Sequence, residues 1–306
     1  MRRALVLGCG GTLGMAWSVA VLRELELAWE WDARRAEVIV GTSAGAELAC
    51  LLGAGVAVAD LHRAQHGDPD APAWLAGHLR ADPGRVPPRP AVRLGSSGLL
   101  IRALSGRAPL LAGLTGALPV GRGDPAWLSE LARTATGGGA WVAHPCTWLV
   151  AADFDTGERV AFGAPGAPPA SIEQALRASW ALPGWLPPVA IGGRRFVDGG
   201  ILSPASADLV ASLGLDEVVV LAPMASSDPG RPVGLLAAAE RLVRRRMTHV
   251  LDGECAAVLE SGARLHRFEP VGRDLAVMGG NFMDARRRAR TLMSAAVSTR
   301  LALGAS

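Results

Sequence analysis

Residues 38–52 read VIVGTSAGAELACLL, and this stretch decides the fold. Val38–Val40 is a short apolar run closed by Gly41, which predicts a buried strand. Ala44–Leu52 is a run of small and apolar residues that predicts a buried helix. Strands that lead directly into helices are typical of parallel sheets covered by helices. The stretch therefore predicts an α/β protein.

The N-terminus has the same order. Ala4–Leu7 predicts a buried strand, Gly8–Gly14 a glycine-rich turn, and Met15–Trp29 a buried helix. The uncharged run from Leu5 to Leu22 also has the length of a signal peptide or a membrane span. Its glycines argue against one continuous helix, because each interior Gly costs roughly 0.5–1 kcal/mol relative to Ala. We therefore expect a cytoplasmic protein without a signal peptide or transmembrane helix, and with at most peripheral membrane contact.

Regular structure resumes after residue 146. Further strands are predicted at Thr147–Ala152, Arg159–Phe162, Val189–Ile191, Arg195–Val197 and Val218–Ala222. Further helices are predicted at Ile172–Trp180, Ala205–Leu213, Val233–Glu260 and Asp284–Leu303. Together these elements predict a three-layer α/β/α sandwich with a mainly parallel central sheet. We expect a single domain over residues 1–306, with the motifs within 4–210 and the helices of 233–303 packed on it.

Residues 59–145 have a weaker pattern, because ten prolines interrupt them. They predict several short helices joined by loops, one of which starts at Asp124-Pro125. An insertion of this size next to a site often acts as a cover. Its apolar residues are predicted either to face an acyl chain or to pack as ordinary core. They are Trp74, Leu79, Leu99, Leu100, Ile101, Leu110, Leu111 and Leu114.

Composition excludes several classes of protein. Of the 306 residues, 50% are hydrophobic and 19% are charged, the reverse of a disordered chain. All 31 basic residues are Arg and there is no Tyr, which excludes Lys- and Tyr-dependent chemistry. The net charge is +3, and the runs Arg244–Arg246 and Arg286–Arg288 lie in predicted helices, so we expect no nucleic-acid partner. Attraction of these runs to an anionic membrane surface remains an alternative. The four Cys form no C-x-x-C pair, which predicts no metal site.

Ser43 lies at the centre of Gly41-Thr42-Ser43-Ala44-Gly45, between the predicted strand and helix. A Ser at a sharp strand-to-helix turn presents its hydroxyl at the carboxyl end of the strand, and Gly on both sides removes clashes. The helix behind it contributes free N–H groups and a partial positive charge. This context favours a nucleophile over a Ser that only caps a helix.

A Ser nucleophile needs a base, and Asp198 is the candidate. It follows the predicted strand Arg195–Val197 and precedes Gly199 and Gly200, so it also lies in a bent backbone at a strand end. Two strand ends of one sheet can bring Ser43 and Asp198 together, and a partly desolvated carboxylate can take the hydroxyl proton. Taken alone, an ordinary Asp-Gly turn also explains Asp198. None of the six His lies in a comparable turn.

Cys9-Gly10-Gly11-Thr12-Leu13-Gly14 follows the first predicted strand. Backbone N–H groups can hold the oxyanion that develops in acyl transfer, and Gly lets the backbone approach closely. A dinucleotide-binding loop is the competing interpretation. It is disfavoured, because Leu13 occupies the position of the third Gly when G-x-G-x-x-G is counted from Gly8.

These three elements, in this order, resemble the patatin-like phospholipase family. That family carries a glycine-rich oxyanion motif, then G-x-S-x-G, then D-G-[G/A], which correspond here to residues 9–14, 41–45 and 198–200. The intervals of about 30 and about 155 residues also resemble the family, as does the stretch 178–184. The resemblance covers roughly residues 4–210 and implies the patatin-like variant of the α/β/α fold.

The resemblance implies a Ser-Asp dyad without His and without a cofactor. Ser43 would attack the ester carbonyl, and Asp198 would act as the general base and then help water to cleave the acyl-enzyme. The oxyanion hole would be formed by Gly10, Gly11 and Thr12. The remaining motif glycines are Gly14, Gly41, Gly45, Gly199 and Gly200. The implied partners are lipid esters (phospholipids, lysophospholipids or acylglycerols) and, transiently, a membrane surface.

Two residues depart from the family pattern. Cys9 replaces the first Gly of the oxyanion motif, and Leu13 replaces a basic residue. If that basic residue holds an anionic headgroup, Leu13 favours neutral esters. Three alternatives remain open: a Ser-His-Asp triad completed by His249 or His266, a catalytically silent lipid-binding protein, and a transacylase.

Overall fold

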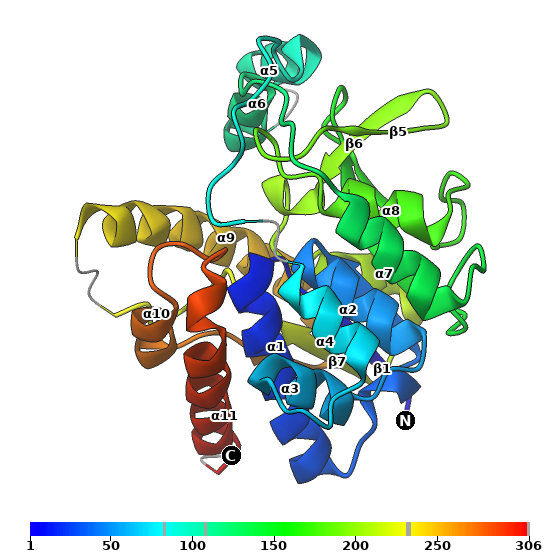
Figure 1. Cartoon of the computed structure of the whole chain (residues 1–306), viewed down its shortest axis with the longest axis vertical. Helices are drawn as coiled ribbons and strands as arrows, with labels where there is room; N and C mark the ends of the chain where they lie inside the picture. The colour runs from blue at the N-terminus through cyan, green and yellow to red at the C-terminus, as the bar shows by residue number, and fades with distance from the viewer. Residues whose placement is uncertain (82–83, 107–108, 231–233, 305–306) are drawn as a thin grey trace.

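A central sheet forms the middle of the molecule in the computed structural model (Figure 1). The structure describes residues 1–306 except 82–83, 107–108, 231–233 and 305–306. Within this part of the chain the strands are β1 (Arg3–Leu7), β2 (Val38–Thr42), β3 (Thr147–Asp153), β4 (Arg159–Phe162), β5 (Val189–Ile191), β6 (Arg194–Asp198), β7 (Glu217–Leu221) and β8 (Arg264–Phe268). Their order is β5-β6-β3-β2-β1-β7-β8, and β4 pairs with β3. The five strands from β3 to β8 in this order run parallel, whereas β4, β5 and β6 pair antiparallel.

Side chains of the strands alternate between two apolar layers, as the strand geometry requires. In β1, Leu5 and Leu7 face one layer, and Ala4 and Val6 face the other. The first layer contains α1 (Gly11–Trp29), α2 (Ala44–Gly53) and α8 (Ile172–Ser179). The second contains α9 (Leu235–Glu260) and the 3₁₀ helix η3 (Ala207–Leu213). The predicted three-layer α/β/α sandwich is therefore confirmed.

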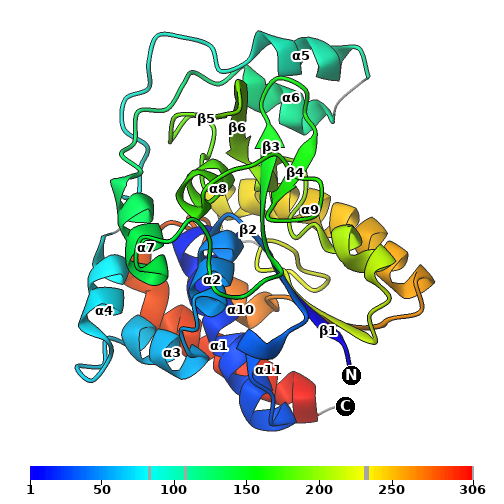
Figure 2. The same ribbon diagram turned by 90° about the vertical axis from the view of Figure 1, so that its right-hand side faces the viewer.

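Further helices surround these layers. They are α3 (Val58–His66), α4 (Ala73–Arg80), α5 (Ser97–Leu104), α6 (Leu110–Gly116), α7 (Ala126–Thr136), α10 (Gly272–Met278), α11 (Arg288–Gly304), η1 (Ala33–Arg35), η2 (Gly199–Ile201) and η4 (Ala285–Arg287). α11 packs along α1, and α5 and α6 project at the opposite end of the molecule from the two termini (Figure 2). Among the described residues, no helix is both long and apolar enough to cross a membrane.

The predicted strands all form, with ends that shift by one or two residues. The first helix differs from the prediction, because it begins at Gly11 instead of Met15 and takes in most of the predicted turn. Glycine disfavours a helix interior, but these glycines occupy its first turn, where the N–H groups have no intrahelical partner. The predicted helix start at Val233 lies outside the described residues, and α9 begins at Leu235.

β8 and α10 were not predicted from the sequence. β8 reads RLHRF, pairs in parallel with β7 at the edge of the sheet and is only partly buried, so it lacks the apolar run of a central strand. α10 is a helix of seven residues whose sequence, GRDLAVM, has too few turns for a clear period.

Candidate active site

Ser43 lies in strained backbone between β2 and α2. Its φ of 58° and ψ of −120° are rare for a residue with a side chain. The Ser43 N–H donates to Ser179 Oγ at 2.9 Å, and that hydroxyl donates to the carbonyl of Val150 at 2.6 Å. Ser179 at the end of α8 therefore ties the turn to β3. This role of Ser179 is not predictable from the sequence, although Ser179 lies in the predicted helix.

Gly45 lets α2 approach the first strand closely. A Cβ at Gly45 would lie 2.0 Å from the carbonyl oxygen of Leu7, so any side chain would force the helix away. The turn of Ser43 consequently lies beside the glycine-rich turn that follows β1.

The glycine-rich turn presents unpaired backbone donors. Gly11 has a φ of 57°, and a Cβ there would lie 2.6 Å from the side chains of Phe282 and Met283. Among the described residues, none accepts a hydrogen bond from the N–H groups of Gly10, Gly11 and Thr12. These groups belong to the first turn of α1 and its N-cap, where such donors are available to a ligand.

Asp198 ends β6 at the same height in the sheet as Ser43. Thr42 pairs with Val150, and Asp198 pairs with the next residue of β3, Ala151. The Asp198 carboxylate is buried and accepts a hydrogen bond from the Gly200 N–H at 2.7 Å. Burial raises the pKa of Asp198 to about 6, and hydrogen bonding from the Ser43 hydroxyl and the Gly200 N–H limits the rise.

Ser43 and Asp198 line one cavity of about 520 Å³. Gly10, Gly11 and Gly200 also line it, whereas Thr12 lines a smaller neighbouring cavity. The remaining wall is mostly apolar and is formed by Cys9, Pro109, Thr115, Trp180, Leu182, Ile201, Leu202, Ser203, Pro204, Met224, Val243, Arg246, Met247, Val250, Phe282 and Met283. A pocket of this size and character fits an acyl chain better than a polar substrate.

Histidine is absent from the described residues that line this cavity. His249 is exposed on α9, and His266 lies on β8, 3.6 Å from Glu217. A third His, His78 on α4, forms a buried pair with Glu47 of α2 at 2.7 Å. This pair lines the smaller cavity, which Trp180 separates from that of Ser43.

The insertion lines the cavity with residues other than those predicted. Pro109 and Thr115 contribute to the wall, but none of the predicted acyl-facing residues with described side chains does. Leu79 and Leu99 are buried in the core, whereas Ile101 is exposed on α5. The side chain of Leu111 lies outside the described residues. The acyl-facing alternative is therefore wrong for the residues with described side chains, whereas core packing is confirmed for Leu79 and Leu99. Apolar character in a short helix does not determine which neighbour covers it.

The two departures from the family pattern are accommodated locally. The Cys9 side chain packs against Gly200, and burial together with the nearby Asp198 raises the pKa of its thiol. Leu13 is completely buried in the first turn of α1 and contributes to the core. Within the described residues, no cluster of three or more His, Cys, Asp or Glu side chains could hold a metal ion.

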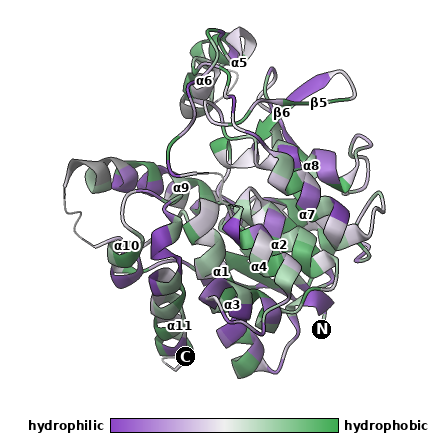
Figure 3. Ribbon diagram, viewed as in Figure 1, coloured by the Kyte–Doolittle hydropathy of each residue, from purple (hydrophilic) through white to green (hydrophobic). Residues whose placement is uncertain are grey.

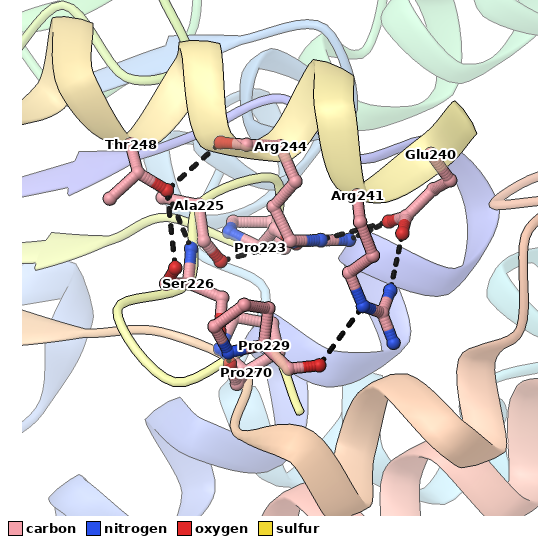
Figure 4. A network of polar contacts seen from close by, with 9 residues as sticks. All are labelled: Pro223, Ala225, Ser226, Pro229, Glu240, Arg241, Arg244, Thr248 and Pro270. Carbon is pink, nitrogen blue, oxygen red and sulfur yellow. Dashed lines mark hydrogen bonds and ion pairs between the residues drawn. The ribbon is translucent and has the colours of Figure 1, made fainter. Parts of the chain in front are cut away.

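Arg244 of α9 holds the loop that follows β7 (Figure 4). Its side chain is 2% exposed, and its guanidinium donates to the carbonyls of Pro223 and Ala225 at 2.6 and 3.0 Å. It also pairs with Glu240 at 2.6 Å. Pro223 also packs against the glycine-rich turn after β1, because its Cγ would lie only 2.8 Å from a Cβ at Gly10.

We expect Arg244→Leu to lower the free energy of unfolding by roughly 3 kcal/mol, because two buried carbonyls lose their donor and the Glu240 carboxylate keeps only Arg241 as a partner. Denaturant titration followed by circular dichroism measures this change. Arg245→Leu is the matched control, since Arg245 is the exposed next residue of the same helix. Equal stability of the two variants would contradict the anchoring role of Arg244.

Comparisons with known proteins agree with the motif-based resemblance. The model of the family "Patatin-like phospholipase" matches residues 133–211, a segment that contains β6 and Asp198. A search of curated proteins gives no match. Among solved structures, the crystal structure of VipD from Legionella pneumophila matches with a TM-score of 0.43 and 14% identity. The match covers 99% of this chain and 66% of that one, so the chain spans about two thirds of the length of VipD. The match to the family model confirms the resemblance to the patatin-like phospholipase family over residues 133–211.

Proposed function

We propose that the protein is a serine acyl hydrolase that cleaves lipid or other carboxylic esters through Ser43 and Asp198. The observation that carries this proposal is the meeting of a strained Ser43 turn, the buried carboxylate of Asp198 and unpaired N–H groups at one apolar cavity. The family similarity over residues 133–211 supports the same reaction class.

The reaction follows from the properties of these groups. Asp198 takes the proton of the Ser43 hydroxyl while the oxygen attacks the ester carbonyl. The N–H groups of Gly10, Gly11 and Thr12 stabilise the oxyanion of the tetrahedral intermediate. Collapse of that intermediate expels the alcohol, which receives the proton from Asp198, and leaves an acyl-enzyme. Asp198 then deprotonates a water molecule that attacks the acyl carbonyl and releases the acid.

The apolar wall indicates where the acyl chain lies. Met224, Val243, Met247 and Val250 line the part of the cavity that α9 and the loop after β7 enclose. Burial of each additional methylene of an acyl chain against such a wall contributes about 0.8 kcal/mol. We therefore infer that the enzyme prefers medium or long acyl chains to acetyl esters.

The decisive experiment compares Ser43→Ala and Asp198→Asn with the wild type on p-nitrophenyl esters and phospholipids. We expect each substitution to lower kcat/KM by at least about 10³-fold, because the two groups act as a unit. Labelling by a fluorophosphonate probe should disappear in Ser43→Ala.

Two controls distinguish the alternatives. His249→Ala and His266→Ala should retain activity within about twofold, since neither side chain lines the cavity. Loss of activity in either variant as complete as in Asp198→Asn would support a triad. An unlabelled, inactive wild type would support a lipid-binding protein.

The pH profile tests the role of Asp198 as base. Burial raises its pKa to about 6, so the carboxyl is mostly neutral at pH 5 and cannot accept a proton there. We expect kcat/KM to increase with pH through about 6 and to reach a plateau above 7. An acid limb near pH 4, the range of an exposed Asp, would contradict this assignment.

Arg246 is expected to select substrates by charge. Its side chain lines the cavity and is exposed, and no described carboxylate pairs with it. We expect Arg246→Gln to raise KM about tenfold for esters that carry a phosphate or carboxylate, because one charge-assisted hydrogen bond is lost. Neutral esters should change little, and Arg245→Gln is the control. An equal effect of Arg246→Gln on neutral and anionic esters would contradict charge selection.

A further inference from the structure

The helices α5 and α6 form a hairpin that projects from the body of the protein. We call α5, α6 and the flanking segments 84–96 and 117–123 the α5–α6 arm. Figures 1 and 2 show both helices at one end of the molecule, away from the two termini. Backbone hydrogen bonds from the Gly95 N–H to the Leu118 carbonyl and from the Val120 N–H to the Arg93 carbonyl join the two flanking segments. The base of the arm is therefore held together by its own backbone hydrogen bonds.

The arm exposes large apolar side chains. Ile101 and Leu104 of α5 are 64% and 72% exposed, and Leu110 and Leu114 of α6 are 60% and 51% exposed. Figure 3 shows the apolar character of both helices. The helices contact each other through other residues, since a Cβ at Gly113 would lie 2.0 Å from that of Ala103. The four large side chains therefore remain uncovered, and a cluster of this kind marks an interaction surface.

The arm is also strongly basic. The sequence from 84 to 123 contains six Arg and no Asp or Glu, whereas the whole chain has a net charge of only +3. The side chains of Arg89, Arg93 and Arg122 are exposed, and no described carboxylate pairs with them. Arg85, in contrast, pairs with Asp284. The concentrated positive charge that the three exposed side chains leave uncompensated attracts an anionic surface.

The arm and α9 both contribute to the wall of the Ser43 cavity. Pro109 and Thr115 of the arm line it on one side, and Val243 and Arg246 of α9 line it on the other. Leu242 and Val243 are exposed on α9, next to Arg245 and Arg246, which are also exposed and have no carboxylate partner among the described residues. Exposed apolar residues and exposed Arg thus occur both on the arm and on α9, the two segments that contribute to the cavity wall.

We propose that the α5–α6 arm, together with the exposed face of α9, docks on an anionic lipid bilayer. Apolar side chains insert at the headgroup level while Arg side chains bind lipid phosphates, which is how interfacial helices bind membranes. The positive charge of the arm is complementary to an anionic lipid surface, which favours a bilayer over other partners. A second copy of the chain would bring two positive arms together, and a nucleic acid would leave the four apolar side chains uncovered. The docking places the cavity entrance at the lipid surface and does not rest on the proposed chemistry.

The test uses the full-length protein with Ser43→Ala, so that hydrolysis cannot alter the vesicles. Flotation with phosphatidylcholine vesicles, alone or mixed with phosphatidylglycerol, measures binding. We expect binding to the mixed vesicles at least tenfold stronger than to phosphatidylcholine alone, and weaker binding as the salt concentration rises. Equal binding to both vesicles, or no binding to either, would overturn the proposal.

Two pairs of substitutions locate the surface. Leu104→Asn with Leu114→Asn, and separately Arg89→Gln with Arg93→Gln, should each lower binding to mixed vesicles at least fivefold. Matched controls for the apolar pair are Leu27→Asn with Leu301→Asn, at side chains 59% and 61% exposed on α1 and α11. Those for the basic pair are Arg35→Gln with Arg273→Gln, at exposed residues outside the arm. Circular dichroism verifies that each variant is folded. An equal loss in the controls would refute this placement of the docking surface.

Two further outcomes would identify a different occupant. If light scattering shows a dimer that the Leu104 and Leu114 substitutions dissociate, the arm is a self-association surface. If the protein binds RNA in preference to mixed vesicles, the positive charge serves a nucleic acid. Retained vesicle binding by Ser43→Ala together with an inactive wild type would refute the proposed hydrolase chemistry but not the docking.

Discussion

The close approach of α2 to β1 is the constraint on which the site depends. The contact between Gly45 and the Leu7 carbonyl leaves no room for a Cβ, so the two turns that follow β1 and β2 lie side by side. Ser43 stays in a backbone conformation that costs of order 1–3 kcal/mol. Complete burial of α2 and the Ser179 hydrogen bond offset this strain. Because both turns are fixed by packing, the hydroxyl and the free N–H groups are held in place before any substrate binds.

Much of this could be predicted from the sequence because the signals are local. Buried strands have apolar runs, and glycines at strand ends mark the sharp turns, so the sequence predicts both Ser43 and Asp198 at strand ends. The reason that they meet was not predictable. β6 runs antiparallel to β3. If β6 paired with the same residues of β3 as β2 does, its carboxyl end, with Asp198, would lie at the edge of the sheet opposite to Ser43. It pairs instead with Ala151–Asp153, beyond the residues paired with β2, so the carboxyl ends of β2 and β6 meet.

The residues that sequence reasoning missed depend on packing between distant segments. Arg244, Arg245 and Arg246 are the same type of residue, but each residue of a helix is rotated by about 100° about the helix axis from the one before it. The first is therefore buried against the loop after β7, the second faces solvent, and the third lines the cavity. The insertion presents the same problem, because its leucines are apolar whether they pack inward or project outward. Only the position of the arm relative to the sheet distinguishes the two.

The position of Arg246 changes what Leu13 implies about the substrate. From the sequence, replacement of a basic residue by Leu13 favoured neutral esters. In the structure Leu13 packs in the core at the start of α1. Whether the missing basic side chain at position 13 matters for an anionic substrate therefore depends on the other charged residues around the cavity. Arg246 of α9 contributes to the wall of that cavity, whereas Leu13 does not. Since attraction depends on where a charge lies and not on which segment carries it, we infer that the cavity is suited to an anionic group despite Leu13. The basic α5–α6 arm at the same entrance acts in the same direction, because its field raises the local concentration of anionic amphiphiles.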